Sequence, residues 1–126
     1  MAETAKNSSD MTEEMQALLE ATTRGLSSGG LKREVDSWLG SGPNEPVTAK
    51  QIESASGPNK VAAACRETGV SLESFAAVLP DIIDEVSPRG KVEISSRSAI
   101  PPKRIEQFID DNKALIRRMY GDFMQP

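Results

Sequence analysis

Residues 61–86 read VAAACRETGVSLESFAAVLPDIIDEV and carry the strongest structural signal in the chain. The first part, residues 61–68, has a helical pattern that ends at Gly69, where a left-handed C-cap favours glycine. Ser71 then offers the hydroxyl group of a helix N-cap. The next helix has apolar residues at steps of three and four: Leu72, Phe75, Ala76, Leu79, Ile82, Ile83 and Val86. We therefore expect two helices joined by a tight turn at the centre of the core.

Pro80 interrupts the second of these helices. A proline either kinks a helix or occupies the first turn of a new one, where its missing N–H group is not needed. We expect two short helices in nearly continuous register, one on each side of Pro80.

Residues 10–25 predict an N-terminal helix. Asp10 and Glu13 have the spacing of a capping box, and apolar residues follow at helical intervals: Met11, Met15, Leu18 and Leu19. Residues 1–9 are small and polar, so we expect them to be disordered. The glycine pair at residues 29–30 is expected to form a flexible joint after the helix.

Two short helices are expected between this joint and the central stretch. The first has apolar residues at i, i+4, i+7 and i+8 and ends at Gly40: Leu31, Val35, Trp38 and Leu39. The second opens with a capping box formed by Thr48 and Gln51, contains Ile52 and ends near residue 57. Asn59 is then placed to cap the helix that begins the central stretch. Residues 40–46 read GSGPNEP and predict a loop.

The residues after the central stretch predict a turn, a short extended segment and a long helix. Residues 87–90 read SPRG, a turn sequence, and residues 91–96 are the candidate for extended structure. The proline pair at 101–102 marks the start of the last helix. Its apolar stripe has Asn112 at one step and is otherwise Ile105, Phe108, Ile109, Leu115, Ile116, Met119, Tyr120 and Phe123.

The composition predicts one small, aliphatic domain. The chain has 126 residues, of which 37% are hydrophobic and 4% aromatic. Its formal net charge of −4 disfavours attraction to nucleic acid or anionic membranes. A single cysteine excludes an intramolecular disulfide and fits a reducing compartment. No apolar run approaches the ~20 residues that span a bilayer, and residues 1–10 lack the apolar centre of a secretory signal, so we expect a cytoplasmic protein.

The residues around Trp38 resemble the YidB-like family of small bacterial proteins. The resemblance rests on Val35, Ser37, Trp38, Leu39, Gly40, Ser41, Gly42, Asn44 and Pro46, followed by Ile52, Gly69, Ser71, Leu79, Pro80 and the SPRG turn. It covers residues 30–92 and implies an all-α, homeodomain-like fold with no established activity.

We therefore expect a small orthogonal helical bundle with a helix-turn-helix-like centre. It divides into a disordered N-terminus (1–9), a YidB-like helical domain (10–96) and a C-terminal amphipathic helix (97–126).

Residues 61–79 also resemble the helix-turn-helix of bacterial repressors. In a DNA reader, the second helix presents basic or amide side chains to the base edges. Residues 71–86 instead contain four acidic residues, Glu73, Asp81, Asp84 and Glu85, and no lysine or arginine. Phosphate groups would repel these side chains, so we do not expect this helix to read DNA.

The C-terminal part of the chain is basic. Residues 89–126 contain eight basic and five acidic residues, a net charge of +3. Three interpretations stay open. This part is a solvent-exposed helix face on which Glu106 pairs with Lys103, and Asp110 or Asp111 with Lys113, at helical spacing. Alternatively, it docks on the acidic residues 71–86, within the chain or in a partner copy, or it contacts nucleic acid through Lys103, Arg104, Lys113, Arg117 and Arg118.

The residue types argue against an enzyme. The chain has no histidine, which removes the usual general acid–base group and the commonest zinc ligand. Cys65 lies on a helix expected to pack and has no base to activate it, so we expect a buried, inert thiol. We therefore expect no catalytic residue, no cofactor and no metal.

The remaining candidates are partner contacts. The last apolar stripe either covers the core of its own chain or forms an interface, since it ends in Met119, Tyr120 and Phe123, residue types favoured at protein interfaces. The loop residues Gly40, Ser41, Gly42 and Asn44 are a second candidate contact, while Trp38 is expected in the core. The sequence thus predicts a non-enzymatic interaction or scaffold module that binds a protein partner or itself. The alternative is a nucleic-acid-binding regulator that uses the basic C-terminal helix.

Overall fold

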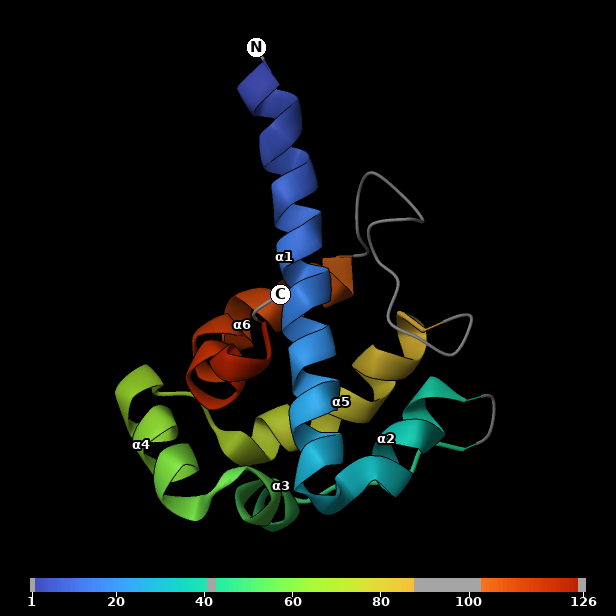
Figure 1. Cartoon of the computed structure of the whole chain (residues 1–126), viewed down its shortest axis with the longest axis vertical. Coiled ribbons are helices and arrows are strands. Elements are labelled where there is room, and N and C mark those ends of the chain that lie inside the picture. The colour runs from blue at the N-terminus through green and yellow to red at the C-terminus, as the bar shows by residue number, and fades with distance from the viewer. Residues whose placement is uncertain (1, 41–42, 88–102, 125–126) are drawn as a thin grey trace.

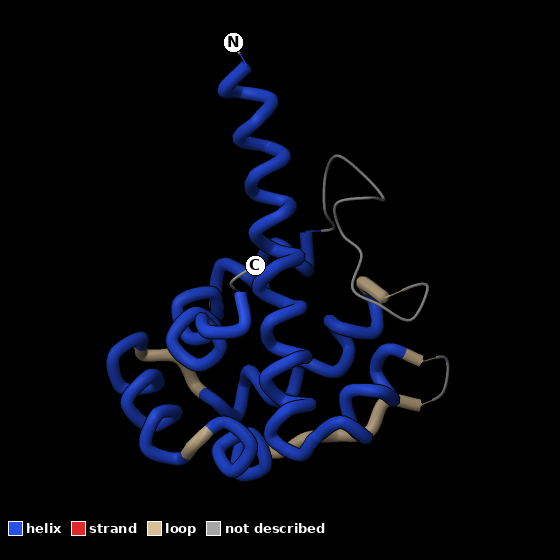
Figure 2. Tube along the Cα trace, in the orientation of Figure 1, coloured by secondary structure: helices blue, strands red, loops and turns tan. Residues whose placement is uncertain are grey.

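A computed structural model of the chain describes residues 2–40, 43–87 and 103–124. The described residues form helices and loops and contain no strand, which confirms the all-α prediction (Figure 2). The helices are α1 (Ala2–Leu26), α2 (Lys32–Leu39), α3 (Ala49–Ser56), α4 (Pro58–Thr68), α5 (Leu72–Glu85) and α6 (Lys103–Tyr120). A π-helical turn, η1 (Ser27–Leu31), joins α1 to α2, and a 3-10 turn, η2 (Gly121–Met124), follows α6.

The core lies where α1, α5 and α6 meet the shorter helices. Figure 1 shows α1 as a long helix whose N-terminal part extends beyond the others. Its C-terminal half packs against α6, η2 and α3, while α5 packs against α2, α3 and α6. Every apolar residue predicted for the stripe of α5 is buried: Leu72, Phe75, Ala76, Leu79, Ile82, Ile83 and Val86. The central stretch is therefore core, as predicted, and α1 and α6 complete that core.

The predicted N-caps of α3 and α5 and the predicted C-cap of α4 are confirmed. Gly69 adopts the left-handed conformation, with φ 73°, and its N–H donates to the carbonyl of Cys65. The Ser71 hydroxyl accepts a hydrogen bond from the N–H of Ser74 at 3.2 Å. Thr48 and Gln51 form both hydrogen bonds of the capping box.

Three local predictions are wrong: the break of α5 at Pro80, the Asn59 cap of α4 and the start of α1 at Asp10. Helix α5 runs without interruption through Pro80, because Leu79 and Ile82 on either side of it pack into one core and outweigh a proline cost of about 3 kcal/mol. Helix α4 begins at Pro58 after Gly57, so proline at the first helical position takes the place of an Asn59 cap.

Helix α1 begins at Ala2 rather than at Asp10, so residues 2–9 are helical where we expected disorder. Adding residues to an existing helix avoids the cost of nucleation, which accounts for this extension. The predicted turn beyond Ser87 and the predicted extended segment 91–96 lie outside the described residues.

Candidate functional site

A surface groove of about 670 Å³ lies between α5 and α6, beside the turn that joins α4 to α5. Its apolar lining comes from Val70, Phe75, Val78, Ile82 and Phe108. Its polar lining includes Ser71 and Ser74 on the α5 side and Arg104, Gln107, Asp111 and Asn112 on the α6 side. The groove therefore has apolar walls with polar groups along its edges, the usual composition of a binding site.

The two walls of the groove meet at an aromatic pair. The rings of Phe75 and Phe108 stack with their centroids 5.7 Å apart and an angle of 18° between their planes. Both side chains are buried, at 1% and 6% exposure, so this contact fixes α5 against α6. Val78 lies one turn further along α5, and 37% of its surface is exposed. A ligand in the groove would meet Val78 first and the aromatic pair below it.

Asn112 explains the polar step in the stripe of α6. Its side chain is buried, and its Nδ2 donates to the carbonyl oxygen of Phe108 at 2.8 Å. This bond satisfies the amide inside the helix, so a buried asparagine costs little at this position. The predicted stripe of α6 is otherwise confirmed, and it faces α1 and α4 of the same chain.

Charged groups lie at both ends of the groove. The Arg104 guanidinium lies 3.2 Å from a carboxylate oxygen of Glu85 and 3.7 Å from one of Asp81. Toward the other end, the Gln107 amide donates to Asp111 at 3.0 Å. The charged residues of the lining are thus Arg104 and Asp111. Together with Asp81 and Glu85, which pair with Arg104 outside the lining, they give a local net charge of −2.

The predicted contact residues of the last helix take a different role. Met119 and Tyr120 are each 1% exposed and belong to the core of the same chain, and Phe123 is partly buried against it. The Tyr120 hydroxyl shares a 2.8 Å hydrogen bond with that of Ser56, and burial raises the pKa of Tyr120 to about 12. Met119 and Tyr120 therefore join the C-terminal helix to its own chain and are not surface contacts for a partner.

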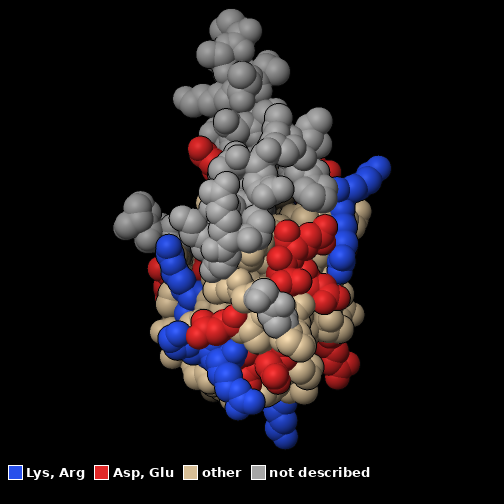
Figure 3. All heavy atoms as spheres, turned by 90° about the vertical axis from the view of Figure 1, so that its right-hand side faces the viewer, with Lys and Arg blue, Asp and Glu red and all other residues tan. Residues whose placement is uncertain are grey.

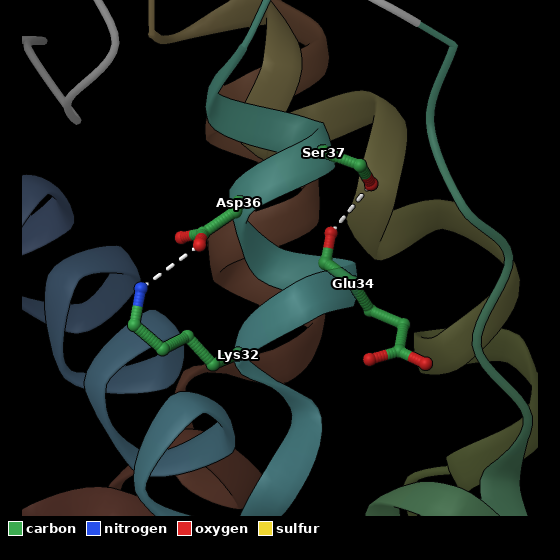
Figure 4. A network of polar contacts seen from close by, with 4 residues as sticks. All are labelled: Lys32, Glu34, Asp36 and Ser37. Carbon is green, nitrogen blue, oxygen red and sulfur yellow. Dashed lines mark hydrogen bonds and ion pairs between the residues drawn. The ribbon is translucent and has the colours of Figure 1, made fainter.

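The loop after α2 is held by the two residues before Leu39. The Ser37 hydroxyl accepts from the N–H of Glu45 at 2.9 Å and donates to the carbonyl of Glu34 at 2.6 Å. Trp38 is fully buried, as predicted, and its Nε1 donates to the carbonyl of Glu45 at 2.7 Å. Ser37 and Trp38 thus bind the peptide group on each side of Glu45. Figure 4 shows the hydrogen bond from the Ser37 hydroxyl to the carbonyl of Glu34. Beside it lies the surface ion pair that joins the Lys32 and Asp36 side chains at 2.9 Å.

The predicted partner contacts of this loop are Gly40, Ser41, Gly42 and Asn44. Gly40 is exposed and ends α2, with its N–H donating to the carbonyl of Asp36 at 3.0 Å. Ser41 and Gly42 lie outside the described residues. Asn44 is half-buried, and its Oδ1 atom is buried without a hydrogen-bond partner among the described residues. The described part of the loop is fastened to α2 through Glu45, and a partner contact at Gly40 and Asn44 stays a prediction.

Three of the five basic residues considered for nucleic acid form ion pairs within the chain. Besides Arg104, Arg117 pairs with Glu14 of α1, and Arg118 pairs with Glu67 of α4 at 2.5 Å. Lys103 and Lys113 are exposed on α6. The pairing of Arg104 with α5 supports the interpretation that the basic helix docks on the acidic residues of its own chain. Figure 3 shows acidic side chains grouped between basic ones on one face of the molecule.

Cys65 is partly buried on α4. Burial raises the pKa of the Cys65 thiol, and the Glu53 carboxylate adds to the rise, so the reactive thiolate is disfavoured at neutral pH. Among the described residues, no group of histidine, cysteine and acidic side chains is placed to hold a metal ion. Within the same part of the chain, no helix combines the length and apolar character that a bilayer crossing needs.

These helices and this groove define a small all-α protein with an open, partly apolar groove on its surface. The sequence model described as YidB-like protein matches residues 8–94, more than half of the chain. The chain therefore belongs to the YidB-like family. The match begins at residue 8 and so includes most of α1, which the resemblance over residues 30–92 had left out.

One curated relative aligns with much of the chain. The Escherichia coli (strain K12) protein described as "Uncharacterized protein YidB" is 37% identical over 83 residues, which are 62% of this chain and 60% of that relative. The chain thus spans less than two thirds of that relative's length. "Protein spaetzle 3" of Drosophila melanogaster is 69% identical over 26 residues, only 21% of this chain and 4% of that protein. No solved structure matches the chain significantly.

Sequence reasoning identified the helices on both sides of the groove but not the groove itself. Val78 was the available signal, because it is an apolar residue outside the buried stripe of α5. The position of α6 beside that residue depends on tertiary packing, which a single helix pattern does not contain.

Proposed function

We propose that this protein is a non-enzymatic interaction module that binds an amphipathic helical segment of a partner protein in the groove between α5 and α6. The observation that carries the proposal is Val78, an exposed apolar side chain beside the Phe75–Phe108 pair. Helix-in-groove binding uses such rows of apolar contacts. The absence of histidine from the sequence supports the non-enzymatic part of the proposal. The unpaired Cys65 supports a cytoplasmic location.

The length of the groove suits a short helix. The α5 wall runs from Ser71 to Ile82. At 1.5 Å per residue, this wall is about 16 Å long, which equals about three turns of a partner helix. Such a helix presents three or four apolar side chains on one face, enough to cover Val78 and the exposed edge of the aromatic pair.

The alternative function, nucleic-acid binding, rests on exposed Lys103 and Lys113 and on the homeodomain-like arrangement that the family resemblance implies. The ion pairs of Arg104, Arg117 and Arg118 count against it, because each would have to be broken to free a phosphate contact. Binding to a 20-base-pair duplex that falls steeply between about 50 and 200 mM salt would favour this alternative.

The test compares substitutions at two exposed, neighbouring positions of α5. Val78 lines the groove, whereas Ala77 is exposed on the same helix and does not line it. The probe is a fluorescent peptide of about 14 residues with leucines at helical spacing and glutamines at the remaining positions. We expect Val78→Glu to weaken peptide binding about tenfold, the effect of losing about 1.5 kcal/mol of apolar burial. Ala77→Glu should leave binding unchanged.

Circular dichroism of both variants controls for folding. Equal effects of the two substitutions, or no binding of the peptide to the unmodified chain, would refute the proposal. Light scattering over a concentration series gives a second check. A dimer that Val78→Glu dissociates would mean that a second copy occupies the groove, and the partner-segment proposal would then be wrong.

A further inference from the structure

We infer that the partner segment is basic: it carries two lysine or arginine side chains, about seven residues apart, on either side of its apolar contacts. This inference rests on the proposed function, since it describes the ligand of the same groove. It adds the charge of that ligand and the acidic positions of the protein that its cations contact.

The first observation is the excess of acidic side chains beside the groove. The outward residues of α5 include four acidic side chains and no basic one, although none of the four lines the groove itself. Of the residues that line the groove, Arg104 is the one cation and Asp111 is the acid on the same helix. Because Arg104 contacts two carboxylates, those of Asp81 and Glu85, its single charge cannot neutralise both.

The second observation is the exposure of this ion-pair cluster. The side chains of Arg104 and Asp81 are 54% and 64% exposed. Ion pairs at such positions are weak, because water and salt screen them and the side chains lose entropy when they are held. A partner cation can therefore approach Asp81 without first breaking a strong interaction.

The third observation is the spacing of the acidic groups. Arg104 and its two carboxylates lie toward one end of the groove, and Asp111 lies seven residues further along α6. Seven residues of helix span about 10 Å, or two turns. A partner helix lying along the groove meets these two acidic positions with side chains at i and i+7. The apolar side chains between them face Val78 and Phe108.

The experiment uses three peptides with the same leucines, which differ only at two flanking positions seven residues apart. These positions carry lysine, glutamine or glutamate, and binding to the full chain is measured by fluorescence anisotropy at low and high salt. We expect the order lysine, glutamine, glutamate, with about a threefold step in affinity for each pair formed. The differences should shrink at high salt, while binding of the glutamine peptide should change little.

Substitutions in the chain locate the effect. Asp81→Asn and Asp111→Asn should each reduce the preference for the lysine peptide about threefold, and Arg104→Gln should increase it. Asp84→Asn is the matched control, because Asp84 is exposed on α5 like Asp81 but does not belong to the cluster of Arg104 with Asp81 and Glu85. All four side chains are exposed, so none of these changes removes a core contact.

The outcomes separate this inference from the proposed function. Equal binding of the three peptides would overturn the inference and leave the groove as a docking site. An effect of Asp84→Asn as large as that of Asp81→Asn would also overturn it, since only the net charge of the protein would then matter. Failure of all three peptides to bind would overturn both.

Discussion

Replacement of Gly29 by alanine tests how closely the turn between α1 and α2 approaches α3. Gly29 lies in η1, and a Cβ atom built on it would be 2.1 Å from the carbonyl oxygen of Ala55 and 2.8 Å from the Cα of Ala55. Carbon and oxygen atoms cannot approach so closely, and the atoms in the way belong to backbone. No side-chain rotation can relieve the overlap, so η1 and α3 must move apart.

The expected magnitude combines two opposing effects. Alanine at a helical position gains up to about 1 kcal/mol over glycine through lower chain entropy. Overpacking a well-packed site costs about 1–3 kcal/mol, and a clash with backbone belongs at the upper end of that range. The net loss for Gly29→Ala is therefore about 2 kcal/mol, which lowers Tm by about 8 °C in a domain of this size.

Urea unfolding followed by circular dichroism measures this loss as a lower midpoint with an unchanged slope. The control is Gly121→Ala, because a Cβ atom at Gly121 would meet no heavy atom within 4 Å. Its free energy of unfolding should change by less than about 0.5 kcal/mol. If Gly29→Ala proves as stable as Gly121→Ala, the close approach of η1 to α3 is not a feature of the folded protein, and the reasoning fails.

Three further substitutions test other parts of the fold. Gly30 has φ 107° and open space around it, so Gly30→Ala should cost about 1–2 kcal/mol through backbone strain alone, read as a lower urea midpoint. Ser71→Ala removes the N-cap of α5 and should cost about 1 kcal/mol in the same assay, whereas Ser74→Ala, which keeps the N–H donor, should cost less. Tyr120 has a folded pKa of about 12, above its ordinary value of 10, so the folded protein holds the phenol proton more tightly. Its contribution to stability is complete below pH 10 and is lost as the pH rises through 12. Tyr120→Phe should lack that part of the alkaline loss, and identical pH profiles would contradict the assignment.

Local signals in the sequence were sufficient for most helices and their ends. The caps at Thr48, Gly69 and Ser71 could be predicted because each involves residues within four positions of one another. The stripe of α5 could be predicted because burial repeats with the helical period. Trp38 was correctly placed in the core for the same reason.

The wrong predictions concern choices made by tertiary packing. The presence of a proline does not show whether the residues on both sides of it bury their apolar side chains in one core. In α5 they do, and this packing keeps the helix continuous through Pro80. The stripe of α6 predicts an apolar face but not which surface covers it. Met119 and Tyr120 were predicted as interface residues because the local pattern does not show what buries them. The helices that α6 packs against, α1 and α4, are far from it in the sequence. The groove arises from the same packing and was missed for the same reason.

The contacts of α6 show that it belongs to the folded unit although the family match ends at residue 94. A Cβ atom at Gly25 would lie 2.3 Å from the Tyr120 ring, so α1 leaves room at Gly25 for a side chain from α6. The hydroxyl of the same tyrosine bonds to Ser56 in α3, which ties three helices at one point. Helices α1 and α3, inside the region that matches the family, thus contact α6, which lies outside it. The wall of the groove that α6 supplies is therefore fixed to the rest of the core, so a ligand between α5 and α6 would meet a preformed site.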